Sequence, residues 1–142
     1  MVAESYQSDN IFAKILSGDI PCHKVYEDDD TLVFMDILPA SRGHCLVIPK
    51  SPSRNLLDVD IPALNAIMMT TQKVAKAAMK VLDADGITIR QNNEAAGGQE
   101  VFHTHFHIMP RYQGEPLRPH DGTAPDHEAL TKIAQEIATA IE

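Results

Sequence analysis

The chain has 142 residues, of which 44% are apolar and 23% are charged. This length and composition are those of a single globular domain, 1–142, and exclude an intrinsically disordered chain. The formal net charge of -8 argues against a nucleic-acid partner, because binding to a nucleic-acid backbone requires clustered Lys and Arg. No segment approaches the roughly 20 apolar residues of a membrane span, and residues 1–10 lack signal-peptide features, so we expect a cytoplasmic protein without membrane contact.

The first third of the chain predicts a short helix followed by a meander of strands. Asp9 and Asn10 are N-cap residue types, and Gly18 stands where a helix can end. Turn-forming residues separate three short segments that are typical of antiparallel strands. The predicted elements are a helix over residues 11–16 and strands at 24–27, 31–35 and 45–48.

The remainder of the chain predicts two more helices and two more strands. A long apolar stripe with Asp60 as N-cap and Pro62 in the first turn is typical of an amphipathic helix. The predicted elements are this helix over residues 61–82, strands at 87–91 and 101–111, and a last helix marked by Pro125 and Asp126. The fold class is therefore predicted as α+β, an antiparallel sheet of about five strands with one long and two shorter helices.

Three of the seven histidines lie in the last predicted strand, at every second position. Because side chains alternate across a strand, His103, His105 and His107 are expected on one face, about 6 to 7 Å apart. Phe106 and Ile108 are expected on the other face. This pattern favours a site for chemistry over three separate structural histidines.

Two chemistries use such a row of imidazoles. A metal ion could take two or three of them, but the sequence has no CxxC or HExxH to complete a zinc site, and Cys22 and Cys45 stand far apart. Alternatively, one imidazole attacks a phosphorus atom while its neighbours donate hydrogen bonds to the phosphate oxygens. The Gly97-Gly98 turn favours the second chemistry, because backbone N–H groups can approach an anion closely there.

At these residues the sequence resembles the histidine triad, or HIT, family, whose signature is His-x-His-x-His preceded by Gln-x-Val. The resemblance covers nearly the whole chain. The matching segments are Asn10 to Ile15, Ile20-Pro21, Val25 to Asp29, Phe34 to Ile37, Gly43-His44 to Lys50, Gln91 to Asn93, and Gln99 to Val101 with the triad and Pro110-Arg111. We therefore expect a HIT-like fold.

The resemblance also implies the roles of individual residues. His105, the middle histidine, is implied as the nucleophile that forms a nucleotidyl-histidine intermediate at the α-phosphate. His103 and His107 are implied to bind phosphate oxygens or assist the leaving group, with Gln99 at the scissile region. Asp36 is implied to accept hydrogen bonds from the ribose, and Asn92 or Asn93 to donate to the ribose or phosphate. The implied walls of the base pocket are Ile11, Phe12, Ile15 and Ile37.

The chain departs from the family pattern at several positions. Asn10 and Ala13 stand where some bacterial members carry zinc-binding cysteines, and Ser51-Pro52-Ser53 stands where those members carry a further histidine, so we predict no metal and no cofactor. Glu100 replaces a frequent Ser or Thr and is expected to point away from the phosphate. The histidines treated as surface or satisfied polar residues, without an identified partner, are His23, His44, His120 and His127.

The sequence as a whole predicts a hydrolase that cleaves the α-phosphate bond of a purine nucleoside 5'-phosphate derivative, such as an AMP phosphoramidate. A dinucleoside polyphosphate hydrolase, a metalloenzyme using the three histidines, and a nucleotide-binding adaptor with little turnover are the alternatives. The resemblance implies a homodimer, for which the stripe of the long helix is a candidate interface.

Overall fold

A computed structural model gives the fold of residues 5–119 and 124–142. The helices are α1 (Ile11–Leu16), α2 (Ile61–Val81) and α3 (His127–Ala140), with a short 3-10 helix η1 at Ala95–Gly97. The strands are β1 (Lys24–Glu27), β2 (Thr31–Met35), β3 (Cys45–Pro49), β4 (Gly86–Arg90) and β5 (Phe106–Arg111).

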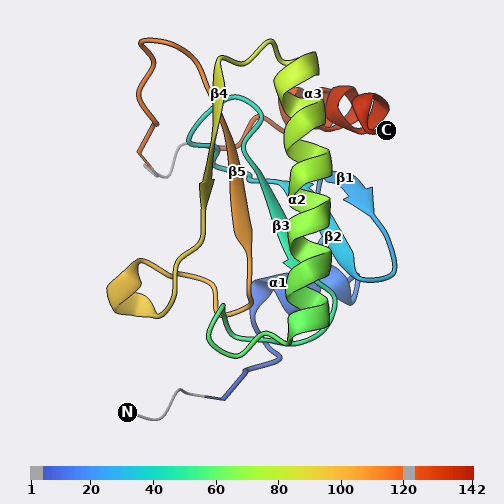
Figure 1. The fold of residues 1–142 in the computed structure, drawn as a ribbon, viewed down its shortest axis with the longest axis vertical. Coiled ribbons are helices and arrows are strands. Elements are labelled where there is room, and N and C mark those ends of the chain that lie inside the picture. Colours follow the sequence, from blue (N-terminus) through green and yellow to red (C-terminus); the bar gives the residue numbers. More distant parts are fainter. Residues whose placement is uncertain (1–4, 120–123) are drawn as a thin grey trace.

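The five strands form one antiparallel sheet in the order β1-β2-β3-β5-β4 (Figure 1). β2 and β3 are buried along their whole length. With one long and two shorter helices, this arrangement confirms the predicted α+β class. β4 is an edge strand, and β5 lies between it and β3.

The two faces of the sheet bury different clusters. Val33 and Val47 belong to the larger core, which α2 and α3 cover. Phe34 and Leu46, their alternate neighbours along the strands, pack with Phe12 of α1 on the opposite face. This alternation follows from the period of two along a strand. α1 covers only part of its face, and the remainder is the floor of the cavity described below.

Each of the three α-helices is capped by a residue that the sequence predicts at its N-terminus. The side chain of Asn10 accepts a hydrogen bond from Ala13 N, and that of Asp60 accepts one from Ala63 N. Asp126 caps α3 in the same way. These caps satisfy N–H groups that a first helical turn leaves without a partner.

The strand predicted over residues 101–111 is wrong in its first half, because β5 begins only at Phe106. The β3 ladder ends at the pair Val47 and Phe106, and the β4 ladder at Arg90 and His107. Before Phe106 the chain instead donates from Thr104 N to the carbonyl of Ser53. Side-chain alternation therefore does not apply to His103 and His105.

The other predicted boundaries hold to within one residue, since β3 and α2 differ from the prediction by one position at their ends and β4 is displaced by one. No helix within residues 5–119 and 124–142 combines the length and the hydropathy needed to cross a lipid bilayer.

Candidate active site

A cavity of about 550 Å³ opens on the face of the sheet that α1 partly covers. Its walls come from α1, the end of β2, the loop that follows β2, and β5. Eight residues predicted for the site line this cavity: Ile11, Phe12, Ile15, Asp36, Ile37, Asn92, His105 and His107. Segments distant in the sequence thus meet at one place.

The ring of His105 has a defined tautomer. Its Nδ1 lies 2.6 Å from the carbonyl oxygen of His103, and a carbonyl can only accept, so Nδ1 carries the proton. Nε2 then keeps its lone pair. Burial lowers the pKa of His105, an effect that the His103 carbonyl and Glu100 oppose, so the ring is neutral near pH 7. Phe12 holds it edge-on, with ring centroids 5.0 Å apart.

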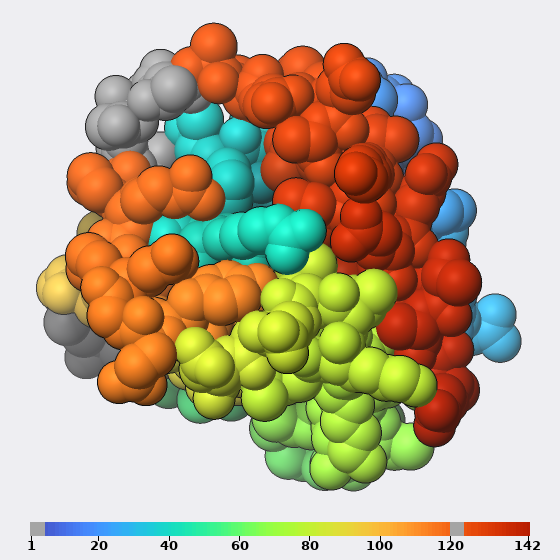
Figure 2. Space-filling model, turned by 90° about the horizontal axis from the view of Figure 1, so that it is seen from above, coloured from blue at the N-terminus to red at the C-terminus, as the bar shows by residue number. Residues whose placement is uncertain are grey.

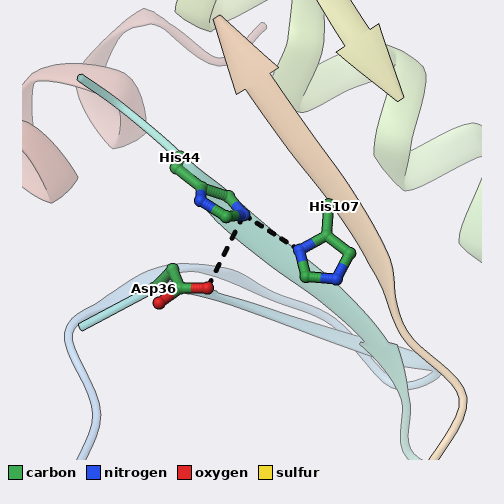
Figure 3. Close-up of side chains that lie close together, drawn as sticks. All are labelled: Asp36, His44 and His107. Carbon is green, nitrogen blue, oxygen red and sulfur yellow. Dashed lines mark hydrogen bonds and ion pairs between the residues drawn. The ribbon is translucent and has the colours of Figure 1, made fainter. Parts of the chain in front are cut away.

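His107 also has a defined tautomer, and His44 determines it (Figure 3). Ala40 N donates to Nδ1 of His44 at 3.0 Å, so His44 carries its proton on Nε2. This Nε2–H donates to Nδ1 of His107 at 2.9 Å. His107 is therefore protonated on Nε2. A neutral ring with an N–H at this position is a donor suited to a phosphate oxygen.

His44 was predicted as a surface or satisfied polar residue without an identified partner, and the structure gives it two partners, Ala40 N and His107. His44 is 4% exposed, and its Nε2 lies 3.6 Å from Asp36 Oδ2. The available signal was its place directly before the buried strand β3, within the segment Gly43-His44 to Lys50 that resembles the family. Only the pairing of β3 with β5 shows that it adjoins His107.

The environment of His107 keeps this ring neutral. Its pKa is lowered to about 4, first by burial and further by the proximity of the His105 ring and of the Arg90 guanidinium. Arg90 is the cross-strand partner of His107. At neutral pH the ring therefore donates a hydrogen bond without carrying a charge.

Asp36, His44 and His107 offer ligand atoms that all lie within 4.8 Å of one another, so they are a candidate metal site. The hydrogen bonds oppose this use. His44 Nε2 carries a proton because Ala40 N occupies its Nδ1, and this proton points to the His107 nitrogen that would bind the ion. One hydrogen bond joins His44 to His107, and Asp36 Oδ2 lies 3.6 Å from the same nitrogen of His44. The absence of a metal remains a prediction.

His103 does not lie where alternation placed it. Its residue is 1% exposed and is not among the residues that line the cavity. Nε2 lies 2.9 Å from the carbonyl of Pro49, and Nδ1 lies 2.7 Å from the hydroxyl of Tyr6. Both ring nitrogens are thus bonded within the protein. Its backbone carbonyl, rather than its ring, contacts His105.

The side chain of Gln99 is also turned inward. Its amide nitrogen donates to the carbonyls of Arg54 at 2.8 Å and Val101 at 3.0 Å. Its oxygen accepts from Glu94 N at 2.8 Å and from the amide of Asn55 at 3.1 Å. Gln99 therefore fixes the loop between β4 and β5, in contrast to the expected contact with the scissile region.

The two asparagines differ in position. Asn92 lines the cavity and donates to the carbonyl of Gly98 at 3.3 Å, where Gly98 has a positive φ of 93°. The oxygen of Asn93 accepts from Leu56 N, and its amide nitrogen donates to Gln91. Of the two, Asn92 has its amide at the cavity.

The predicted base pocket is partly open. Ile11 and Ile37 are 45% and 48% exposed, while Phe12 is buried. Asp36 lies at the edge of these apolar side chains, where its Oδ1 accepts from Leu38 N at 2.9 Å. Two isoleucines left open beside a carboxylate are unusual for a core and suit an apolar ring linked to hydroxyl groups.

Three charged residues at the cavity were not predicted there from the sequence. Glu100 was expected to point away from the phosphate, but it lines the cavity, where its charge opposes the lowering of the His105 pKa by burial. The strand alternation behind that expectation does not exist before Phe106. Arg90 and Arg118 also line the cavity, and no pattern in the sequence marked them.

Arg118 belongs to the segment after β5, which bonds back to the loop after β2 through Arg118 N and the carbonyl of Ala40 at 2.8 Å. Figure 2 shows the segment near residue 40 in a hollow between the segment after β5 and α3.

Of the other histidines, His23 and His127 are hydrogen-bonded to each other at 2.8 Å, and His120 lies outside the described residues.

Comparisons with known proteins agree with the fold. The HIT domain family model matches residues 17–114. The chain belongs to the HIT family. A crystal structure of a HIT-like protein involved in cell-cycle regulation from Bartonella henselae shares 48% identity and a TM-score of 0.93, covering 97% of this chain and 100% of that one. The match to this family supports a nucleotide-binding hydrolase.

Two curated relatives are more distant. An uncharacterized HIT-like protein of Borreliella burgdorferi is 42% identical over 75% of this chain and 78% of its own length. The adenylylsulfatase HINT3 of Arabidopsis thaliana is 33% identical over 98% of this chain and 71% of its own length.

Proposed function

We propose that this HIT protein hydrolyses the bond between the α-phosphate and a nitrogen or oxygen leaving group in a purine nucleoside 5'-phosphate derivative. The observation that carries the proposal is the pair of tautomers: His105 keeps a lone pair on Nε2, and His107 keeps a hydrogen on Nε2. A nucleophile and a donor for the phosphate oxygens thus stand side by side, with ring centroids 5.1 Å apart.

The reaction proceeds in two steps. In the first, Nε2 of His105 forms a bond to phosphorus while the bond to the leaving group breaks, and the leaving group takes up a proton from solvent. In the second, water attacks phosphorus, the bond to Nε2 breaks, and the water releases a proton. Together the steps add one water to one bond, and the product is a nucleoside 5'-monophosphate.

The ring of His105 carries positive charge in the intermediate, because Nε2 is bonded to phosphorus while Nδ1 keeps its proton. The carbonyl of His103 at 2.6 Å stabilises this charge. His107 donates to a non-bridging oxygen. In this proposal His103 acts through its backbone, in place of the contact with the phosphate oxygens or the leaving group that the family resemblance implies for its ring.

The remaining cavity residues hold the nucleotide. Asp36 accepts hydrogen bonds from the ribose hydroxyls, and Asn92 donates to the ribose or phosphate. Ile11 and Ile37, with Phe12 and Ile15, pack against the base. An AMP phosphoramidate is the proposed substrate. The Arabidopsis relative is an adenylylsulfatase, which supports an adenylyl group as the transferred part. Dinucleoside polyphosphates and nucleotide binding without turnover remain alternatives.

The test is a single turnover with an AMP phosphoramidate, quenched in alkali because a phosphorus bond to histidine is acid-labile, and analysed by mass. An adduct of one AMP on the peptide with His105 is expected. His105→Ala should form none, and His23→Ala, a histidine outside the cavity, should behave as wild type. Full turnover by His105→Ala would refute the mechanism, and activity lost to EDTA would favour the metalloenzyme.

We further propose that the protein is a homodimer that uses α2 and the edge strand β4. Ile61 and Met69 of α2 are 65% and 72% exposed, and Ile89 of β4 is 45% exposed. Exposed apolar side chains beside a free strand edge favour a covered surface. Light scattering should give twice the chain mass, and Met69→Glu should reduce it; a monomer at all concentrations would contradict this interface.

A further inference from the structure

The segment that carries His103 and His105 precedes β5 and has no strand partner, so individual hydrogen bonds fix its position. Thr104 N donates to the carbonyl of Ser53 at 2.9 Å, and the Thr104 and Ser53 hydroxyls are 2.6 Å apart. The His103 ring donates to the carbonyl of Pro49. These contacts lead to the last residue of β3, Pro49, and to Ser53 in the turn that follows.

One further contact comes from a different part of the chain. Tyr6, which precedes α1, places its hydroxyl 2.7 Å from Nδ1 of His103. The two rings meet edge to face, with centroids 5.6 Å apart. Because Pro49 fixes the His103 proton on Nε2, Nδ1 can only accept, so the Tyr6 hydroxyl donates. Tyr6 thus satisfies a ring nitrogen that is buried.

The carbonyl that orients the nucleophile belongs to the same residue. His103 holds Nδ1–H of His105 at 2.6 Å through its backbone oxygen, while its ring is held between Tyr6 and Pro49. A shift of the His103 ring would move this carbonyl. Tyr6 itself is not among the residues that line the cavity.

We propose that Tyr6 is a positioning residue for the nucleophile, which acts on His105 through the ring and carbonyl of His103. This inference rests on the proposed function, because it assigns His105 the attack on phosphorus. The segment before α1 is then part of the catalytic apparatus although it does not contact the substrate. Tyr6 should affect the rate of attack and leave nucleotide affinity unchanged.

The test is Tyr6→Phe, which keeps the ring and removes only the hydroxyl. Since a neutral hydrogen bond contributes modestly, we expect kcat and the rate of AMP-adduct formation to fall about threefold to tenfold. KM and the Kd for AMP should stay within about twofold, because Tyr6 is outside the cavity. The matched control is Tyr112→Phe, which removes a hydroxyl bond of 3.0 Å to the carbonyl of Leu82.

A second measurement separates positioning from general stability. Side-chain nitrogen NMR of histidine reports the tautomer of each ring. Wild type should show His103 as the Nε2–H form, and Tyr6→Phe should change the His103 and His105 signals while Tyr112→Phe leaves them unchanged. Unchanged spectra and an unchanged adduct rate in Tyr6→Phe would overturn the proposal, as would an equal rate loss in both variants.

The two proposals fail in different ways. If wild type forms no AMP adduct, the proposed function is wrong, and the NMR comparison still shows whether Tyr6 controls the two rings. If wild type forms the adduct and Tyr6→Phe forms it at the same rate, the function stands and the role of Tyr6 is refuted.

Discussion

Two successive hydrogen bonds, from Ala40 N to His44 and from His44 to His107, lead to a prediction that the sequence alone does not allow. His44→Leu removes the N–H that holds Nδ1 of His107 without a proton. The ring of His107 can then place its proton on Nδ1, and Nε2 turns a lone pair toward the phosphate. A hydrogen bond to an anion becomes a repulsion, although His107 itself is intact.

The size of the effect follows from hydrogen bonds to charged groups, which contribute about 1.5–3 kcal/mol. At about 1.4 kcal/mol for each factor of ten, kcat should fall by roughly 10-fold to 100-fold. The variant also leaves the partly buried N–H of Ala40 without its acceptor, which should lower the free energy of unfolding by about 1 kcal/mol.

The assay is steady-state hydrolysis of an AMP phosphoramidate at neutral pH, with urea unfolding measured on the same preparations. His44→Gln is the informative companion, because its amide can still donate to His107 and should recover part of kcat. His23→Leu removes a histidine that also bonds to a second histidine, but outside the cavity, and should keep the activity of wild type.

Wild-type kcat in a folded His44→Leu protein would refute the reasoning. So would NMR evidence that His107 carries its proton on Nδ1 in wild type, because the tautomer argument begins from that assignment. Equal loss in His44→Leu and His44→Gln would show that the packing of the imidazole matters and its N–H does not.

Three further outcomes are expected. Because the folded pKa of His107 is lowered to about 4 from 6.5, the neutral ring contributes a constant stability above about pH 6.5, and this contribution is lost as the pH falls toward 4. Between pH 7 and 5 the free energy of unfolding in urea should therefore fall by about 2 kcal/mol more in wild type than in His107→Asn. Gly43→Ala places a Cβ against Leu82 Cδ1 at a φ of +91° and should lower the free energy of unfolding by about 3 kcal/mol in the same measurement. Gly18→Ala has a similar φ of +87° but nothing within 4 Å, so it should lower the free energy of unfolding by only about 1 kcal/mol, from backbone strain. Equal losses in the two variants would contradict the clash with Leu82. Asp36→Asn should raise the calorimetric Kd for AMP about tenfold and leave that for 2',3'-dideoxy-AMP unchanged, and an equal change for both nucleotides would exclude the ribose contact.

Much of the fold could be predicted because its signals are local. The caps Asn10 and Asp60 and the apolar stripe of α2 depend on residues within a few positions of each other, and the structure confirms them. The first half of the last predicted strand could not be predicted correctly. Whether residues 101–105 pair with a neighbour depends on where the β3 and β4 ladders end, which is a long-range property.

The residues of the candidate site also divide into those that the sequence identified and those that only the fold revealed. The sequence pattern identified His105 and His107, and the resemblance singled out His105 as the implied nucleophile. Neither predicted that His44 would fix the tautomer of His107, nor that the ring of His103 would face Tyr6, because these contacts join residues 63 and 97 positions apart.

What the sequence determined by itself is the set of chemical groups: the triad, the glycine turn, Asp36 and the apolar residues around it. What only the tertiary structure decided is which nitrogen of each histidine carries the proton. That choice depends on backbone groups that can only donate or only accept, Ala40 N and the carbonyls of Pro49 and His103, and the fold alone brings them to the rings. An imidazole acts as a nucleophile or as a hydrogen-bond donor according to the group that is bonded to its other nitrogen, so the residue type alone does not determine its role.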